Sequence, residues 1–248
     1  MFLRSAADSE KTWNSDRKNL SALASLQISE AYAAFTLEML GDISASLQYY
    51  ERSFARGNLL LQSDRVTAAN QEYFRKSKLM AVRVLWIVSS GKGDFRPFFE
   101  NANPTDGEIR AVLASGWTTY ADELKTFAFP LGPRLDAARM ALDQNRRLVA
   151  DHPSGANRFL LAECLRIIGD VHFELARPAA GQEKRSNYQR SLEYYSEAHA
   201  LLNSLKESGE FPKDQHIFHG VVKNYLAEVE DRLRDPAHLG GNLSAGNP

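Results

Sequence analysis

Residues 45–54 read ASLQYYERSF, and residues 190–199 read RSLEYYSEAH. The two stretches share Ser-Leu, then Gln or Glu, then Tyr-Tyr, at Ser46–Tyr50 and at Ser191–Tyr195. A phrase that recurs within one chain is the sequence signature of a repeat protein, in which similar units stack side by side. Repeat proteins commonly work as extended binding surfaces. The repeated phrase therefore predicts a repeat architecture and a binding role.

The rest of the chain shows the spacing of amphipathic helices, with apolar residues three or four positions apart. Ala, Leu, Glu, Lys and Arg dominate, and alternation of β-branched residues is almost absent. We therefore expect an all-α chain of about eight helices. The expected ranges are 11–40 with a break near Ser25, 43–62, 66–88, 108–127, 134–150, 156–176, 186–205 and 213–233.

Residues 89–107, SSGKGDFRPFFENANPTDG, interrupt this pattern, and their Gly, Pro and Asn content predicts a loop. Its three phenylalanines, Phe95, Phe98 and Phe99, have two interpretations. They pin the loop against the helices, or they form a docking patch. The Gly- and Pro-rich residues 236–248 are expected to be disordered, so the helical-repeat domain is expected to span residues 1–235.

Composition limits the choice of partners and of compartment. The 248 residues carry a formal net charge of −1 and no long basic run, so we expect neither a nucleic-acid nor a membrane partner. The single cysteine, Cys164, excludes an internal disulfide and favours a reducing compartment. The first residues lack the apolar core of a signal peptide, and the apolar run Val84–Val88 is too short to cross a bilayer. We expect a cytoplasmic protein.

Motifs for catalysis or metal binding are missing. Gly91-Lys92-Gly93 lacks the spaced glycine and the following hydroxyl residue of a phosphate-binding loop. His216 and His219 have no carboxylate at a matching spacing, which favours packing histidines over a metal site. Cys164 and His172 lie about 12 Å apart along one helix, too far for a hydrogen bond. We expect no catalytic residue, no metal and no cofactor.

The repeated phrase and its surroundings resemble the tetratricopeptide repeat (TPR), a pair of antiparallel helices. That family has a large residue, Leu-Gly and an aromatic residue on the first helix, and Ala/Ser-Leu, an aromatic residue and Ala on the second. The best matching residues are Leu165, Ile168, Gly169, Ser191, Leu192, Tyr195 and Ala198, together with Trp117. The equivalent positions Ser46, Arg134 and Ser191 are 88 and 57 residues apart, whereas the family period is about 34. The repeats are therefore elongated or interrupted by loops.

A narrower resemblance covers residues 134–235 well and residues 20–65 moderately. The segments 146–176 and 191–214 look like the repeat arrays found C-terminal to bacterial eukaryotic-type serine/threonine kinases. No Gly-rich loop, His-Arg-Asp or Asp-Phe-Gly kinase motif accompanies them. The resemblance implies a right-handed α-solenoid of three to four antiparallel TPR-like helix pairs with a C-terminal capping helix.

In such a solenoid the first helix of each pair lines the concave face. Its non-packing positions are the expected partner-binding residues: Glu163, Arg166, Asp170, Phe173, Glu174, Thr118, Asp122, Lys125, Phe35 and Glu38. The resemblance implies a non-catalytic module that binds a partner protein or peptide in bacterial signalling or complex assembly. Two alternatives stay open: a self-associating structural protein that forms homo-oligomers, and, less favoured, an all-α small-molecule sensor or enzyme.

Overall fold

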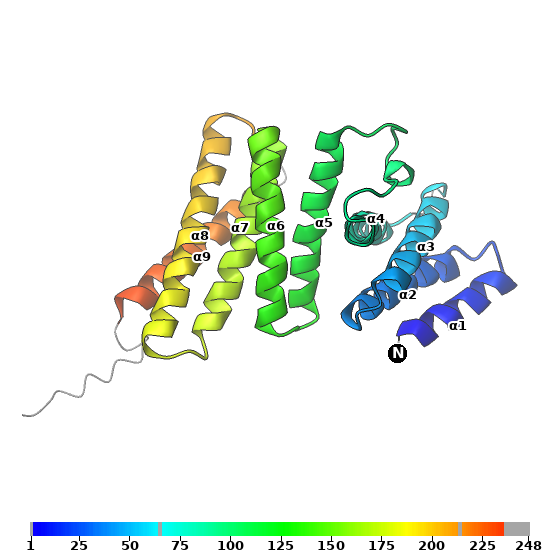
Figure 1. Ribbon diagram of the computed structural model, residues 1–248, viewed down its shortest axis with the longest axis horizontal. Coiled ribbons are helices and arrows are strands. Elements are labelled where there is room, and N and C mark those ends of the chain that lie inside the picture. Colours follow the sequence, from blue (N-terminus) through cyan, green and yellow to red (C-terminus); the bar gives the residue numbers. More distant parts are fainter. Residues whose placement is uncertain (1, 64–65, 213–214, 236–248) are drawn as a thin grey trace, which may run out of the picture. The chain divides into compact units, whose positions relative to one another are not determined.

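The computed structural model describes residues 2–63, 66–212 and 215–235. Within these ranges it contains nine α-helices, one short 3-10 helix and no strand (Figure 1). The elements are α1 (Phe2–Ser15), α2 (Leu20–Met39), α3 (Ile43–Leu61), α4 (Ala68–Val88), η1 (Arg96–Phe98), α5 (Asp106–Thr126), α6 (Leu131–Asp151), α7 (Gly155–Ala176), α8 (Gly181–Glu207) and α9 (His216–Arg234). The predicted all-α class is confirmed, and the expected tail over 236–248 lies outside the described residues.

The first predicted segment, 11–40 with a break near Ser25, is wrong in its start and in the position of its break. The chain forms two helices there, and the break falls at residues 16–19 instead of near Ser25. Asn19 explains the position, because its side-chain oxygen accepts a hydrogen bond from the backbone N–H of Ala22 and so caps α2. Another correction concerns α8, which begins at Gly181, five residues before the predicted start.

Both copies of the repeated phrase lie on helices, α3 and α8, and place the same positions in the core. Ser46 and Ser191 have no exposed surface, and Tyr50 and Tyr195 are 2% and 1% exposed. Residues four apart share one face of a helix, so Ser and the second Tyr point the same way. The phrase marks the buried stripe of each helix.

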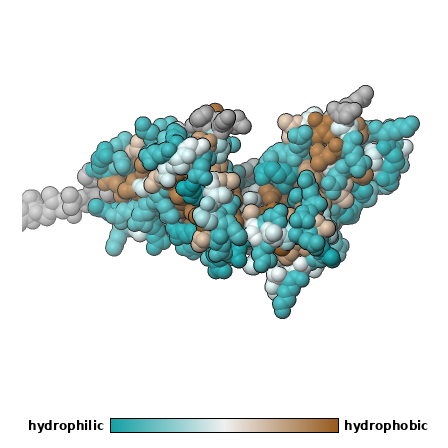
Figure 2. All heavy atoms as spheres, turned by 90° about the horizontal axis from the view of Figure 1, so that it is seen from above, coloured by the Kyte–Doolittle hydropathy of each residue, from teal (hydrophilic) through white to brown (hydrophobic). Residues whose placement is uncertain are grey.

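The chain divides into two compact units, unit 1 up to Thr119 and unit 2 from Tyr120. Consecutive helices pack against each other in both: α1 to α4 in unit 1, and α6 to α9 in unit 2. Hydrophilic side chains cover most of the visible surface, with hydrophobic ones gathered in narrower patches (Figure 2). This consecutive packing is compatible with an α-solenoid.

Unit 1 has a polar centre within its apolar core. The Ser53 hydroxyl on α3 donates to the backbone oxygen of Gln27 on α2 at 2.7 Å, and lies 2.9 Å from the Ser77 hydroxyl on α4. The Gln27 amide donates to Ser77 at 3.3 Å. Because all three residues are buried, these hydrogen bonds fix how α2 sits on α3 and α4.

Unit 1 also contains an internal repeat with a period of 48 residues. Ser5 on α1 and Ser29 on α2 form a hydroxyl pair at 3.1 Å, and Ser53 and Ser77 repeat it 48 positions later. Both pairs join residues that are 24 positions apart. The helix caps follow the same period, because Asn19 caps α2 and Thr67 caps α4. The α1–α2 hairpin is therefore the structural counterpart of the α3–α4 hairpin.

The loop over 89–107 is held against unit 1 by its phenylalanines. Phe95 and Phe98 are buried, and the Phe98 ring lies 5.4 Å from that of Phe54 on α3. Lys78 on α4 lies over the Phe99 ring. The pinning interpretation is confirmed for Phe95 and Phe98, because a buried ring has no surface to offer to a partner.

Unit 2 is built of two helix layers. Asp122 and Lys125 of α5 pair with Arg166 and Asp170 of α7 in the same order along both helices, so α5 and α7 run parallel. The helix α9 also runs parallel to α7, since Phe218 meets Phe159 near the start of α7 and Val229 joins the cluster near its end. The helices α6 and α8 run the opposite way and form the second layer. The layers are α5–α7–α9 and α6–α8.

The final helix covers apolar surface at one side of unit 2. Val222 and Val229 of α9 have no exposed surface, and Tyr225 stacks on Tyr195 of α8 at 5.5 Å. Val229 joins Phe173 and Ala176 of α7 in one buried cluster. The helix α9 thus gives α7 and α8 the apolar partner that an exposed repeat would lack.

The closest approach of α7 and α8 occurs at Gly169. A Cβ atom at this position would lie 2.7 Å from the Tyr195 ring, nearer than side chains normally come. The Ser191 hydroxyl donates to the Gly169 carbonyl at 2.9 Å, which binds the two helices at the same point. Glycine is required here by the close approach of the neighbouring ring.

We predict that Gly169→Ala lowers the free energy of unfolding by about 1–3 kcal/mol, because repacking around the added methyl outweighs the helix propensity of Ala. Chemical denaturation followed by circular dichroism measures the change. Gly132→Ala is the control, since a Cβ at Gly132 meets nothing within 4 Å. Equal stability of the two variants would contradict the close crossing at Gly169.

Candidate functional site

The ten residues predicted for partner binding divide into two groups. The first group is buried and comprises Phe35, Glu38, Thr118, Asp170 and Phe173. The second group keeps part of its surface in solvent and comprises Asp122, Lys125, Glu163, Arg166 and Glu174. The structure brings five of the ten into one connected set, which we call the α5–α7 face: Asp122, Lys125, Arg166, Asp170 and Glu174.

Asp170 is the centre of the α5–α7 face. Its Oδ2 atom lies 2.9 Å from Lys125 Nζ and 2.6 Å from Arg166 Nη1. Its Oδ1 atom accepts a hydrogen bond from the Tyr195 hydroxyl at 2.7 Å. The side chain is only 6% exposed, so the carboxylate has lost most of its water. The three donors replace the hydrogen bonds that water would make. Burial and the adjacent carboxylate raise the pKa of Tyr195, which keeps its hydroxyl a donor.

Glu174 forms the second node, one turn further along α7. Its carboxylate accepts two hydrogen bonds from Arg134 of α6, at 2.7 and 3.0 Å, in the two-pronged geometry that suits guanidinium. Burial alone would raise the pKa of Glu174, but Arg134 and Lys125 outweigh it and hold that pKa below its ordinary value. Glu174 therefore stays ionised and links α6, α7 and, through Lys125, α5.

The outer members of the face are accessible. The side chains of Asp122 and Lys125 are 50% and 41% exposed, and Arg166 is 18% exposed. Asp122 lies 3.7 Å from Arg166, whose guanidinium also stands 5.9 Å from the Phe218 ring of α9. Glu163 lies one turn before Arg166 on α7. The accessible charges alternate in sign, so the face carries no strong net charge.

Sequence reasoning missed Arg134 and Tyr195 as members of the network. Both lie on helices of the second layer, α6 and α8, which the repeat pattern assigned to packing. They are nearly buried, and each reaches through the layer to a carboxylate on α7. The sequence did contain a signal for both: a charged or hydroxyl group stands where the second helix of a pair would have a packing residue.

Two predicted residues in unit 1 serve the core instead of a surface. Glu38 is 8% exposed and pairs with Arg83 of α4, which is 1% exposed and lies over the Trp117 ring. Phe35 is buried one turn earlier on α2. A buried pair of this kind stabilises the arrangement of helices only while both partners remain.

Reactive and metal-binding groups are scarce among the described residues. Burial raises the pKa of the Cys164 thiol to about 12, so the thiol stays protonated and packs as a small buried group. In the described ranges no three His, Cys, Asp or Glu side chains lie together as a metal site. None of the described helices is long and apolar enough to cross a membrane.

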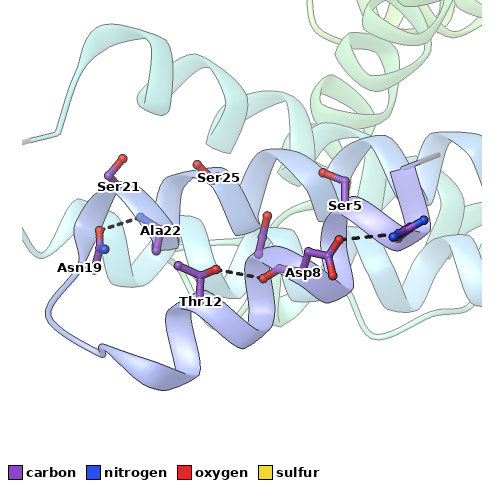
Figure 3. A pocket seen from close by; sticks show the side chains of 9 residues that line it. Ser5, Asp8, Thr12, Asn19, Ser21, Ala22 and Ser25 are labelled. Carbon is purple, nitrogen blue, oxygen red and sulfur yellow. Dashed lines mark hydrogen bonds and ion pairs between the residues drawn. The ribbon is translucent and has the colours of Figure 1, made fainter.

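Unit 1 carries a cleft of about 610 Å³ between α1 and α2. Small hydroxyl side chains line much of it, and Figure 3 shows Ser5 and Thr12 on α1 and Ser21 and Ser25 on α2. Arg4 and Asp8 form an exposed ion pair at its edge. Sequence reasoning missed this cleft, because its residues are small and the break between α1 and α2 was misplaced.

Comparisons of the chain with protein-family models, with curated proteins and with solved structures give no match. The resemblance to tetratricopeptide repeats therefore remains a proposal, and the argument for function rests on the geometry described above.

We predict that Asp170→Asn lowers the free energy of unfolding by about 2–4 kcal/mol, because loss of one buried partner leaves the other charges of the network uncompensated. Urea denaturation measures the change. Glu197→Gln is the control, because Glu197 and its partner Arg146 are 41% and 52% exposed and such pairs contribute about 1 kcal/mol or less. Equal effects of the two changes would contradict the central place of Asp170.

A second buried carboxylate, Glu30 of α2, responds to pH in the opposite sense from Glu174. It has no exposed side-chain surface and lies 2.9 Å from Arg52 and 3.7 Å from Arg56 of α3. Burial raises the pKa of Glu30, and the two arginines offset this only in part. A raised carboxylate pKa favours folding at low pH, and this contribution is lost as pH rises through the folded-state pKa.

We predict that the stability difference between the native chain and Glu30→Gln changes with pH. As pH falls from neutral toward the unfolded-state pKa of 4.5, the native chain should gain free energy of unfolding relative to the variant, because Gln cannot take up the proton. Denaturation curves recorded at several pH values measure the difference. If the stability difference stays constant or shrinks on acidification, the pKa of Glu30 is not raised in the folded state.

Proposed function

We propose that the chain is a non-catalytic interaction module that binds a partner protein or peptide on the α5–α7 face. In this proposal its helix pairs are TPR-like and stack into a right-handed α-solenoid with α9 as the C-terminal cap. The observation that carries the proposal is the convergence of five predicted residues from two parallel helices into one charged set, with Asp170 buried at its centre and Asp122 and Lys125 accessible. The parallel α5–α7–α9 layer would form the binding side of the array.

The energetics of the face suit reversible binding. Its inner pairs, Arg134 with Glu174 and Tyr195 with Asp170, are largely buried and hold the helices together. Its outer pair, Asp122 with Arg166, is 3.7 Å long and half exposed on the Asp122 side. Exposed ion pairs of this kind contribute little to stability, so a partner can replace them at low energetic cost. The folded framework would remain in place during the exchange.

The charge pattern defines the class of partner. Asp122 and Glu163 offer negative charge, and Lys125 and Arg166 offer positive charge, within a few turns of helix. Complementary charges give specificity and fast association more than raw affinity. A peptide segment of alternating charge fits this face better than a uniformly acidic or basic one. The resemblance to kinase-linked repeat arrays supports a setting in bacterial signalling or complex assembly.

We predict that reversing two charges on this face abolishes partner capture. The native chain and the variant Asp122→Arg/Glu163→Arg are used as affinity baits in source-cell lysate, and captured proteins are quantified by mass spectrometry. The amount of partner captured by the variant should be at least about tenfold lower than with the native chain. A tenfold change corresponds to about 1.4 kcal/mol of binding free energy.

The matched control makes the same charge change on the other layer, at exposed positions of α6 and α8: Asp143→Arg/Glu193→Arg. It should capture the partner as the native chain does. Both variants must first show native melting temperatures. Identical captures from the face variant and the control would remove the α5–α7 face as the binding site.

A further inference from the structure

The cleft between α1 and α2 has an occupied counterpart inside unit 1. The 48-residue period set by the two serine pairs relates each cleft position to a position on α3 or α4. The cleft residues Arg4, Ser5, Asp8, Thr12 and Ser25 correspond to Arg52, Ser53, Arg56, Leu60 and Tyr73. The element that covers those five counterparts therefore indicates what the cleft could bind.

The helix α2 contacts all five, and Glu10 of α1 adds ion pairs to two of them, Arg52 and Arg56. The contacts are Arg52 and Arg56 with Glu30, Ser53 with Gln27, Leu60 with Leu23 and Leu26, and Tyr73 with Tyr32. The surface of α3 and α4 that corresponds to the cleft thus binds a helix, α2. At the cleft itself the lining comes from α1, α2 and the turn between them (Figure 3). The cleft thus corresponds in position to a surface that seats a helix, and its lining carries polar groups that a further helix could contact.

We propose that this cleft binds α9 of a second copy of the chain, in the place that α2 takes over α3 and α4. In the α5–α7–α9 layer of unit 2, α9 is the last helix described and has one neighbour in that layer, α7. Its inner side is buried against α7 and α8, which leaves its outer side for another contact.

The outer side of α9 has the residues such a contact needs. Ile217, Asn224, Ala227 and Asp231 are exposed and lie three, four or seven positions apart, so they form one stripe along the helix. Gly220 lies on the same stripe, and a Cβ there would meet nothing within 4 Å. Small residues in the middle of a stripe allow two helices to approach closely. This matches the small side chains that line the cleft.

The polar groups of the two surfaces are complementary. In unit 1 the Gln27 amide donates to the Ser53 and Ser77 hydroxyls from the covering helix. On α9 the Asn224 amide lies near the middle of the stripe and carries the same donor group. It would meet the equivalent hydroxyls, Ser5 and Ser29. A side-chain amide would then contact a pair of serine hydroxyls in both places, under α2 in unit 1 and under α9 in the proposed contact.

Charged residues on the rim of the cleft can also pair with residues of opposite charge on α9. Arg4 and Asp8, on the cleft rim, are 91% and 63% exposed. On α9, Lys223 and Asp231 are exposed two turns apart. When α9 lies antiparallel to α1, as α2 lies to α3, Lys223 comes toward Asp8 and Asp231 toward Arg4. This orientation is the one that the helix equivalence requires.

The proposed contact joins two different surfaces, the cleft of one copy and α9 of the next. A contact of this type is either made twice in a reciprocal two-fold dimer or continues head to tail into rings or open chains of copies. An open assembly keeps one free cleft at one end and one free α9 at the other until it closes. That property makes the contact testable by blocking each surface separately.

Two variants block the two surfaces. Ser25→Trp fills the cleft from an exposed position of α2, and Ala227→Trp obstructs the outer stripe of α9. The controls place the same residue on exposed sites of α1 and α8, Ala7→Trp and Ala200→Trp. All four positions are exposed, so the folded state should tolerate the new side chain, which circular dichroism and melting temperature verify. Sedimentation velocity then measures the size distribution at concentrations up to about 1 mM.

The native chain and both control variants should form assemblies that grow with concentration, whereas each blocked variant alone stays monomeric. An equimolar mixture of Ser25→Trp and Ala227→Trp should form dimers and nothing larger, because only one cleft and one α9 remain open in each pair. A native chain that is monomeric at every concentration overturns the proposal and assigns the cleft to a helix of another protein. Assembly that persists in either blocked variant overturns it as well.

Discussion

The hydrogen bond from the Tyr195 hydroxyl to Asp170 joins the packing of unit 2 to its surface. The Tyr195 ring fills the space that Gly169 leaves open, so α7 and α8 approach closely. Its hydroxyl ends at a carboxylate that also receives Lys125 and Arg166. A change in how α7 and α8 pack would therefore move the charges of the α5–α7 face. The residues of the α5–α7 face, which we propose to bind a partner, are held in place by contacts with the core.

Both units pair their buried polar groups across several helices, and neutral groups have a larger share in unit 1. Unit 1 uses neutral hydroxyl and amide groups between α2, α3 and α4, together with two sets of ion pairs: Glu38 with Arg83, and Glu30 with Arg52 and Arg56. Unit 2 uses a charged network that continues from the interior to the surface. Neutral pairs specify which helices meet, whereas a network that reaches solvent can also exchange partners. We therefore propose partner binding on the accessible charges of unit 2, and self-association through the cleft of unit 1 and α9 of unit 2 in another copy.

Much of the fold follows from sequence periodicity, because apolar spacing alone locates α3, α4, α5 and α7 to within two residues. The break at residues 16–19 was not predictable from that spacing, because the segment contains neither Gly nor Pro and the cap is a single Asn19. The 48-residue repeat escaped notice for a similar reason. It is carried by isolated serines and capping residues instead of a phrase, and only their contacts reveal it.

Five of the ten residues predicted for the site are neighbours in the structure, and their binding role stays a prediction. The non-packing positions of α5 and α7 do converge, because parallel helices of one layer place equivalent turns side by side. Glu38 could not be placed the same way, since its burial depends on Arg83, and the register of α4 is ambiguous in sequence. Arg134 and Tyr195 lie on the opposite layer, so their reach into the network required side-chain geometry.

The most direct test of this account is a double-mutant cycle between Lys125→Met and Tyr195→Phe, measured as free energies of unfolding. The two side chains lie on different helices and share Asp170 as their partner. If Asp170 ties the face to the helix crossing, the effects should be non-additive, with a coupling energy of about 0.5 kcal/mol or more. Strictly additive effects would contradict the claim that the core of unit 2 holds its binding face.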